Sequence, residues 1–150
     1  MLVATSLGEA PLPSMTGNDE INTVQGLIDQ KAVARPDVAF LISPETGRML
    51  TFKELQEQAR HLGARLRRMG LARGDKIAFL MDNGLFTAQL FLGAMYAGFV
   101  SVPLNVRAGV SQLSYTLGHC DAKVVFVGEQ YGALIKEAMV DVQRPVEVFW

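Results

Sequence analysis

The sequence predicts an α/β fold in which a mostly parallel sheet is flanked by helices and preceded by an N-terminal β-hairpin. From Lys76 onward, short apolar runs typical of strands alternate with helical patterns, and this alternation requires parallel strands joined by crossover helices. Before it, two apolar runs flank the turn sequence Ser43–Gly47, which is typical of a hairpin. Hydrophobic residues make up 49% and charged residues 19% of the 150 residues, so a folded globular domain is expected.

The chain divides into a tail and one domain. Residues 1–20 contain scattered proline, glycine and small polar residues without periodicity, and they are predicted to form a flexible or extended tail. Residues 21–150 are predicted to form a single α/β domain, since their number suits one domain. The chain stops inside the last predicted strand, on Phe149 and Trp150, so we expect a domain truncated at its C-terminal end, with the remainder of its own chain as a partner.

A helix and a hairpin are predicted first. Asn22 or Thr23 can cap the helix, and Pro36 ends it. The hairpin strands are predicted at Val38–Ile42 and Met49–Thr51, because proline and glycine in the intervening turn favour its backbone angles.

The next helix has the strongest end signals. Thr51 and Glu54 predict a capping box, in which each side chain accepts a hydrogen bond from the other residue's backbone N–H. Gly70 predicts a left-handed C-terminal cap, with Leu71 contacting Leu66 as in a Schellman motif. The apolar residues between these ends step by 4, 3, 4 and 3 and predict one buried stripe: Leu55, Ala59, Leu62, Leu66 and Met69.

The remaining elements alternate. Apolar residues on both faces place the first of these strands at the centre of the sheet, whereas Pro103 ends its own strand or places it at an edge. The first of the helices is apolar nearly all round and is predicted to be buried. The predicted strands are Lys76–Met81, Phe99–Leu104, Lys123–Val127 and Val146–Trp150, and the predicted helices are Leu85–Ala97, one capped by Ser111 that ends near Gly118, and Gln130–Met139.

Charge and composition exclude several function classes. Lys plus Arg is 14 and Asp plus Glu is 15, so no net field attracts nucleic acid, and no nucleic-acid partner is expected. The uncharged stretch from Asn83 to Val106 is long enough to cross a bilayer, but Gly98 and Pro103 favour a buried helix, a turn and a strand over a transmembrane segment. Cys120 is the single cysteine and no signal peptide is recognisable, so a cytoplasmic location is expected.

Familiar catalytic motifs are missing. None of the 14 glycines falls in the spacing of a dinucleotide-binding or P-loop phosphate motif. The run His119-Cys120-Asp121 contains nucleophile chemistry, but adjacent residues seldom face one another, and we favour a histidine at a helix end beside a buried cysteine. The only other histidine is His61, so no metal site is predicted.

A basic cluster lies along and after the second predicted helix. It can contact a phosphate-bearing ligand or partner, but we favour a solvated helix face, since no aromatic residues are interleaved for nucleic-acid binding. Its members are Arg60, His61, Arg65, Arg67, Arg68, Arg73 and Lys76.

Six segments that span most of the chain resemble a known family. They are Leu50–Leu55, Ala64–Leu71, Arg73–Ala78, Leu92–Gly98, Val102–Asn105 and Ala122–Val127, with Asn83 between the third and fourth. In this order and spacing the chain resembles the adenylate-forming (AMP-binding) enzymes, which include acyl-CoA synthetases, peptide-synthetase adenylation domains and beetle luciferases. Asp82–Phe86 departs from the family, because many members have Leu-Pro-Asn here; the variant is closer to the carnitine- and aromatic-acid-type CoA ligases.

The resemblance implies the N-terminal subdomain of an acyl-CoA synthetase-like fold and an ATP-dependent acid–thiol ligase as the parent. Such a ligase activates a carboxylic acid as an acyl-adenylate and transfers the acyl group to CoA, with ATP, Mg²⁺ and CoA as cofactors. The family's catalytic and metal-binding groups lie downstream of the resembled segment, so none is assigned here, and this chain alone is expected to be inactive and to bind no cofactor tightly. Arg107, in the loop after the Pro-Leu-Asn strand, is the one candidate contact, with a CoA phosphate; the alternative is a solvated loop arginine.

Two alternatives remain at the level of sequence. One is a non-catalytic α/β binding or oligomerisation module, which could form a homo-oligomer through the exposed edge of its last strand. The other is a peptide-synthetase-type adenylation domain, whose acceptor is a carrier-protein thiol in place of CoA.

Overall fold

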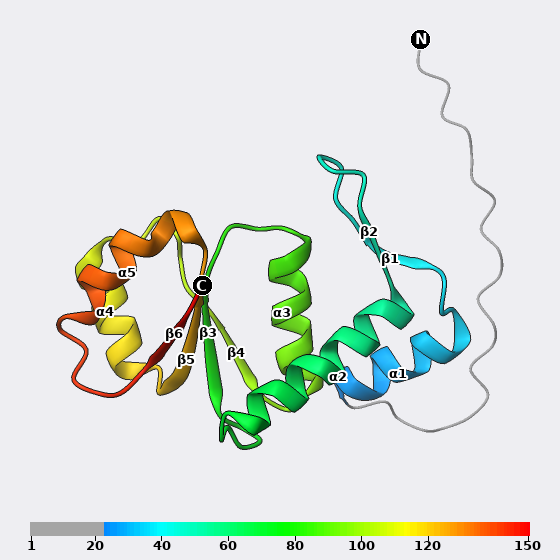
Figure 1. The fold of residues 1–150 in the computed structure, drawn as a ribbon, viewed down its shortest axis with the longest axis horizontal. Coiled ribbons are helices and arrows are strands. Elements are labelled where there is room, and N and C mark those ends of the chain that lie inside the picture. Colours follow the sequence, from blue (N-terminus) through cyan, green and yellow to red (C-terminus); the bar gives the residue numbers. More distant parts are fainter. Residues whose placement is uncertain (1–22) are drawn as a thin grey trace, which may run out of the picture.

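The fold is an α/β sandwich with a hairpin at one end (Figure 1). The computed structural model describes residues 23–150, so the tail predicted for residues 1–20 lies outside the described residues. In chain order the elements are α1 (Val24–Ala34), β1 (Ala39–Ile42), β2 (Met49–Thr51), α2 (Phe52–Arg68), β3 (Lys76–Leu80), α3 (Leu85–Tyr96), β4 (Val100–Pro103), α4 (Val110–His119), β5 (Ala122–Val127), the 3₁₀ turn η1 (Glu129–Tyr131), α5 (Gly132–Met139) and β6 (Glu147–Phe149).

The predicted first helix and hairpin are confirmed. The hydroxyl of Thr23 accepts a hydrogen bond from the backbone N–H of Gly26 at 3.0 Å and caps α1. β1 and β2 pair antiparallel, with Ile42 opposite Met49. Gly47 closes the turn at φ 66°, a left-handed angle that favours glycine.

Both ends of α2 have the predicted geometry. At the start, the Thr51 hydroxyl accepts from the backbone N–H of Glu54, and the Glu54 carboxylate accepts from the backbone N–H of Thr51 at 2.8 Å. At the end, Gly70 has φ 87° and the backbone N–H of Leu71 donates to the Leu66 carbonyl at 3.2 Å. The capping box and the Schellman motif therefore fix the ends of this helix.

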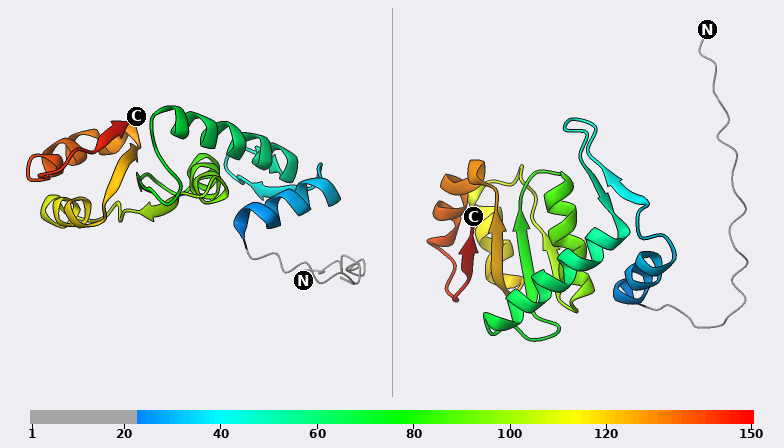
Figure 2. Two further views of the ribbon diagram at one scale, coloured as in Figure 1. Left: turned by 90° about the horizontal axis from the view of Figure 1, so that it is seen from below. Right: turned by 45° about the vertical axis from the view of Figure 1, so that its right-hand side comes forward.

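The sheet is parallel throughout, with the order β4-β3-β5-β6. β3 is an inner strand, as its apolar residues predict, and Pro103 lies on the edge strand β4. Helices cover the two faces separately (Figure 2): α4 and α5 pack against Ala78, Leu80 and Val125, and α2 and α3 pack against Ile77 and Phe79 on the other side.

Ion pairs join the amino ends of the two inner strands. The Lys76 ammonium lies 3.1 Å from the carboxylate of Asp121, and the Lys123 ammonium lies 2.8 Å from the carboxylate of Asp75. The register between β3 and β5 shifts after Lys76, so that Ile77 pairs with Val124 and the residue between is bulged. Lys123 is therefore exposed while its neighbours in β5 are buried.

Two predictions about helices need correction. Ser111 does not cap α4, because the helix begins at Val110 after Gly109, whose extended backbone ends the preceding loop without a side-chain cap. α3 is not buried all round: Phe86 is 59% and Met95 36% exposed, because the helix faces the sheet and α2 on one side only. No helix within residues 23–150 is long and apolar enough to cross a membrane.

Candidate functional site

The crossover connections reverse direction at the carboxyl ends of β3 and β5. From β3 the chain runs through α3 to β4 on one side, and from β5 it runs through α5 to β6 on the other, with the two helices on opposite faces. In open α/β sheets, ligands bind in the crevice outside the strands at such a reversal. A ligand site is therefore expected in the loops that follow these strands.

A cavity of about 580 Å³, which we call the carboxyl-end pocket, lies at this reversal. Its walls come from the loops after β3 and β4 and from the 3₁₀ turn after β5. The residues that line it are Met81, Asp82, Asn83, Leu104, Asn105, Val106, Arg107 and Tyr131. Charged and amide side chains from two connections and a tyrosine hydroxyl from a third thus converge on one space, as in binding sites where a few placed polar groups orient a ligand.

Asp82, Gln130 and Tyr131 form a hydrogen-bonded group that we call the Asp82 clamp. The Tyr131 hydroxyl donates to Oδ1 of Asp82 at 2.5 Å, and the Gln130 amide donates to Oδ2 at 2.7 Å. The bond from Tyr131, and then that from Gln130, holds the pKa of the Asp82 carboxyl below its ordinary value, because both donors stabilise the charged form. The same bond raises the pKa of Tyr131. The clamp joins the loop after β3 to the turn after β5.

Backbone contacts fix the turn that supplies the two donors. The backbone N–H of Gly128 donates to the Leu80 carbonyl at 2.9 Å, and the backbone N–H of Tyr131 donates to the Gly128 carbonyl at 2.8 Å. The Gln130 side chain folds against Gly128 so closely that a Cβ there would lie 2.9 Å from Gln130 Oε1. A glycine at this position therefore lets the amide reach Asp82.

Arg107, the predicted contact for a CoA phosphate, lies on the wall of this pocket. Its backbone N–H donates to Oδ1 of Asn105 at 2.9 Å, which turns the loop after β4. Its guanidinium makes no ion pair or hydrogen bond with any of residues 23–150, although its charge helps to lower the pKa of Asp82. An exposed guanidinium without a partner is suited to donate hydrogen bonds to an anionic oxygen.

The run His119-Cys120-Asp121 does not assemble a nucleophile. Nδ1 of His119 lies 2.7 Å from the Tyr115 carbonyl within α4, and its ring stacks on that of Tyr115. Cys120 is half-buried against the core, and Asp121 forms an ion pair with Lys76 at the amino end of the inner strands. The three side chains have separate structural partners. His119 lies at the end of α4 as predicted, whereas Cys120, predicted to be buried, is only half-buried.

The basic cluster divides among different environments. Arg60 contacts Asp29 and Tyr96, and Arg67 donates to the Ala97 carbonyl at 2.9 Å, so these two arginines join α2 to neighbouring helices. Lys76 belongs to the ion pairs at the amino end of the sheet. The remaining members on α2 are exposed and line a second cavity: His61, Arg65 and Arg68.

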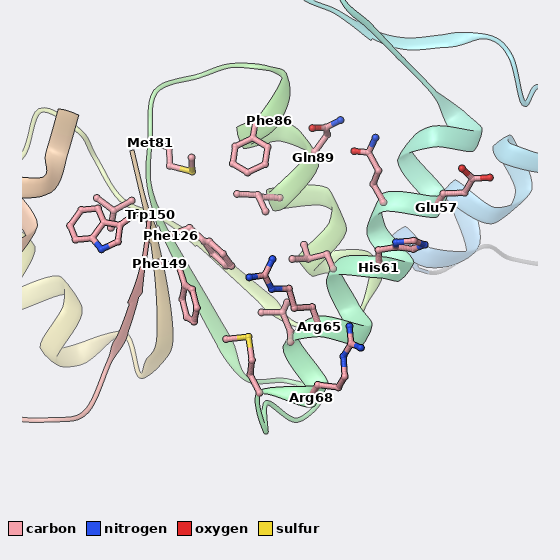
Figure 3. Close-up of a pocket in the computed structure, with 16 residues that line it drawn as sticks. Glu57, His61, Arg65, Arg68, Met81, Phe86, Gln89, Phe126, Phe149 and Trp150 are labelled. Carbon is pink, nitrogen blue, oxygen red and sulfur yellow. The ribbon is translucent and has the colours of Figure 1, made fainter. Parts of the chain in front are cut away.

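This second cavity, the helix–sheet groove, has a volume of about 640 Å³ and lies between α2, α3 and the face of β5 and β6 (Figure 3). Phe126 and Phe149 form its floor, with their ring centroids 5.6 Å apart. Its lining is mainly apolar, and its charged groups lie on the exposed turns of α2 (Figure 3). Polar groups converge in the carboxyl-end pocket instead, so we take that pocket as the candidate site.

Within residues 23–150, no three His, Cys, Asp or Glu side chains lie close enough together to hold a metal. The loop after β3 lacks the glycine spacing that exposes backbone N–H groups to phosphates. The residues of the Asp82 clamp and the neighbouring Asn83 were not predicted as site residues. The sequence Asp82-Asn83-Gly84 does indicate a turn at the end of a strand, but nothing in the sequence indicates that Tyr131, 49 residues later, contacts Asp82.

Comparisons with known proteins agree on one family. The model of the AMP-binding enzymes matches residues 28–148. The chain is 35% identical to sulfoacetate–CoA ligase from Cupriavidus necator over 133 residues, which are 89% of this chain and 26% of that protein. The solved N-terminal domain of FACL13 from Mycobacterium tuberculosis aligns with 86% of this chain at a TM-score of 0.76 and 27% identity, and 33% of that domain is covered.

Length varies among the relatives. This chain spans about a quarter of sulfoacetate–CoA ligase. It is also 26% identical over 132 residues to the uncharacterized protein Rv1549 of Mycobacterium tuberculosis, and these residues are 88% of this chain and 75% of that protein. The same fold region thus occurs both within long ligases and in a short chain.

Proposed function

The chain belongs to the AMP-binding enzyme family, and we propose that it is the N-terminal part of an ATP-dependent acyl-CoA ligase. In such a ligase a carboxylate attacks the α-phosphate of ATP to give an acyl-adenylate and pyrophosphate. The CoA thiol then attacks the acyl carbon, which gives a thioester and AMP. The observation that supports this most is the match of nearly the whole described fold to the N-terminal domain of FACL13.

Within that ligase, residues 21–150 are proposed to form the α/β N-terminal subdomain of the AMP-binding domain. The catalytic and metal-binding groups, and the sites for ATP and Mg²⁺, are proposed to lie in the part of such a ligase that this chain does not span, since the chain covers about a quarter of sulfoacetate–CoA ligase. The chain alone is therefore proposed to be inactive. The chain has a single cysteine and so no disulfide of its own, and a cytoplasmic location is proposed.

We propose that Arg107 contacts a phosphate of CoA. The support is its place on the carboxyl-end pocket, at the reversal of the crossovers, with a guanidinium that no residue of 23–150 engages. Guanidinium–phosphate hydrogen bonds are charge-assisted and stronger than neutral ones. Here the site is exposed, so the contact orients the phosphate end of CoA and contributes modestly to its affinity.

An NMR titration of this chain with CoA tests the contact. Arg107→Ala is expected to weaken CoA binding about threefold to tenfold, because one charge-assisted hydrogen bond is lost at an exposed site. Arg48→Ala is the control, since Arg48 lies on the hairpin away from the pocket. Dephospho-CoA, which lacks the 3′-phosphate, identifies the phosphate concerned. Equal affinities of Arg107→Ala and wild type for CoA contradict the proposed contact.

A second candidate function is a non-catalytic binding module. The short relative Rv1549, three quarters of which this chain covers, favours it. The same titration separates the two candidates, because a module outside CoA chemistry gives no shift of the Arg107 side-chain signal with CoA.

A further inference from the structure

One face of the sheet is covered only in part, beside the helix–sheet groove. On the opposite face, α4 and α5 bury the β5 residues Val125 and Val127 almost completely. On the groove side, α2 and α3 bury β3 but leave the floor residues Phe126 and Phe149 only half-buried. Both faces of a parallel sheet are normally covered. The groove is therefore a surface on which a partner can bury apolar area.

Two exposed aromatic side chains stand at the walls of this groove (Figure 3). Phe86 on α3 is more than half exposed, and the ring of Trp150 is 61% exposed on the side of β6. Large aromatic side chains supply much of the area that protein interfaces bury, and they are enriched there relative to the rest of the surface. The groove thus has the apolar composition of the centre of an interface.

The rim that α2 contributes to the groove changes sign along its length. Glu57, His61 and Arg65 are exposed and follow one another at four-residue spacing, so they lie along one side of the helix. Arg68 follows near the far end of the groove from Glu57 (Figure 3). Neither Glu57 nor Arg65 forms an ion pair with any of residues 23–150. The rim is therefore negative at one end and positive at the other.

We propose that the helix–sheet groove binds a second copy of this chain in a two-fold symmetric dimer. A two-fold axis that crosses the groove at the level of His61 sets α2 antiparallel to its copy, and His61 lies midway between Glu57 and Arg65. Glu57 of each copy then faces Arg65 of the other, so a single surface is complementary to itself. The two grooves face each other, and the rings of Phe86 and Trp150 are removed from water.

A short relative favours a second copy over a further segment of the same chain. The residues that align with Rv1549 make up 75% of that protein, so only a quarter of it is left to cover this face of the sheet. The inference does not depend on the proposed contact between Arg107 and CoA, because Arg107 lines a different cavity.

The test is analytical ultracentrifugation of the chain over a series of concentrations, which gives the Kd of the dimer. Glu57→Arg and Arg65→Glu are each expected to raise this Kd at least about tenfold, because each places like charges opposite one another twice. Phe86→Ser is expected to raise it about as much, since apolar area is lost from the interface. Glu137→Arg is the matched control, because Glu137 is exposed on α5 at the opposite face of the sheet. Circular dichroism of each variant confirms that it is folded.

An equimolar mixture of the Glu57→Arg and Arg65→Glu proteins gives the sharpest result. In a dimer with one copy of each, positions 57 and 65 are both positive in one copy and both negative in the other, so both contacts attract. The mixture is expected to associate within about threefold of the wild-type affinity, although neither variant does so alone. Mixing Glu137→Arg with Arg65→Glu brings the same net charges together but leaves position 57 negative in both copies, and it should not recover association.

Three results overturn the inference. If the wild-type chain is monomeric at every concentration, the groove is left to another occupant, such as a further part of an AMP-binding domain. If Glu57→Arg and Arg65→Glu dimerise as wild type does, the contact lies elsewhere, for example at the free edge of β6. If the mixture of these two variants does not recover association, the two charges do not face each other across a two-fold axis. None of these results bears on the CoA titration of Arg107→Ala.

Discussion

A glycine on α2 provides the sharpest test of how the helices pack. Gly63 is buried where α2 meets the end of α3, and a Cβ built on it would lie 2.7 Å from the Cβ of Ala97. Ordinary contacts begin near 3.4 Å, and both atoms are attached directly to helix backbone, so Gly63→Ala requires the helices to separate. The new methyl would also lie 3.3 Å from the Arg67 guanidinium, which donates to the Ala97 carbonyl.

Two effects of opposite sign decide the magnitude. Alanine favours a helix over glycine by about 1 kcal/mol. Overpacking a close contact costs about 1–3 kcal/mol, and disturbing the Arg67 hydrogen bond adds about 1 kcal/mol. The expected net effect of Gly63→Ala is a loss of about 1–3 kcal/mol in the free energy of unfolding, measured from the urea midpoint at unchanged slope.

Gly118→Ala is the matched control. Gly118 lies in α4 with nothing within 4 Å of the position its Cβ would take, so only the helix preference acts and stability should rise by up to about 1 kcal/mol. Adding Ala97→Gly to Gly63→Ala removes the opposing methyl and should recover part of the loss. If Gly63→Ala is as stabilising as Gly118→Ala, the close packing of α2 and α3 described here is wrong.

Two further predictions concern the N-terminal helices. Burial alone would raise the pKa of Asp29, but hydrogen bonds from Tyr96 at 2.7 Å and Gln56 outweigh it and lower that pKa. The stability that this carboxylate contributes is therefore present above its unfolded pKa of about 4, and it is lost as the pH falls through the lower pKa of the folded state. In urea unfolding at pH 7, Asp29→Asn should be about 1 kcal/mol less stable than wild type. This difference should close as the pH is lowered below about 4. A difference that is constant with pH would refute the role of the charge. Thr51→Ala removes the cap of α2 and should cost about 1 kcal/mol in the same assay, whereas Thr51→Ser should cost much less; equal stability of all three proteins would show that the cap contributes nothing.

Local signals predicted most of the fold. The capping box of Thr51 and Glu54 and the left-handed Gly70 involve residues within a few positions of one another, and the structure confirms both. Pro103 was predicted to end its strand or to place it at an edge, and it is the last residue of β4, which is an edge strand; proline has no N–H to donate to a further strand. Alternation of strands and helices also predicted parallel pairing. These features depend on the order of residues along the chain, which the sequence displays directly.

Contacts between segments that are distant in the chain could not be predicted from the sequence. The Asp29–Tyr96 hydrogen bond joins residues 67 positions apart, and the bond between Asp82 and Tyr131 joins residues 49 apart. Neither pair has a local pattern, since each depends on the strand order and on which face each helix covers. The exposure of Phe86 was missed for the same reason, because an apolar helix does not reveal how much of its surface has a neighbour.

The site was predicted in part. Arg107 was selected from the resemblance, and the structure places it on the carboxyl-end pocket. Its contact with CoA stays a prediction. The pocket's other polar wall, the Asp82 clamp, required the reversal of the crossovers at β3 and β5, and this reversal became visible only with the strand order.

The paired charges at the amino ends of β3 and β5 have a consequence for how this fold can diverge. There, each lysine is paired with an aspartate across the strands, and because the lysines are exposed, the loss of one partner is expected to cost little stability. At the opposite end, the guanidinium of Arg107 lacks such a counterpart among residues 23–150. Substitutions of Arg107 therefore break none of the ion pairs found among residues 23–150, whereas substitutions of Lys76 or Lys123 each break one.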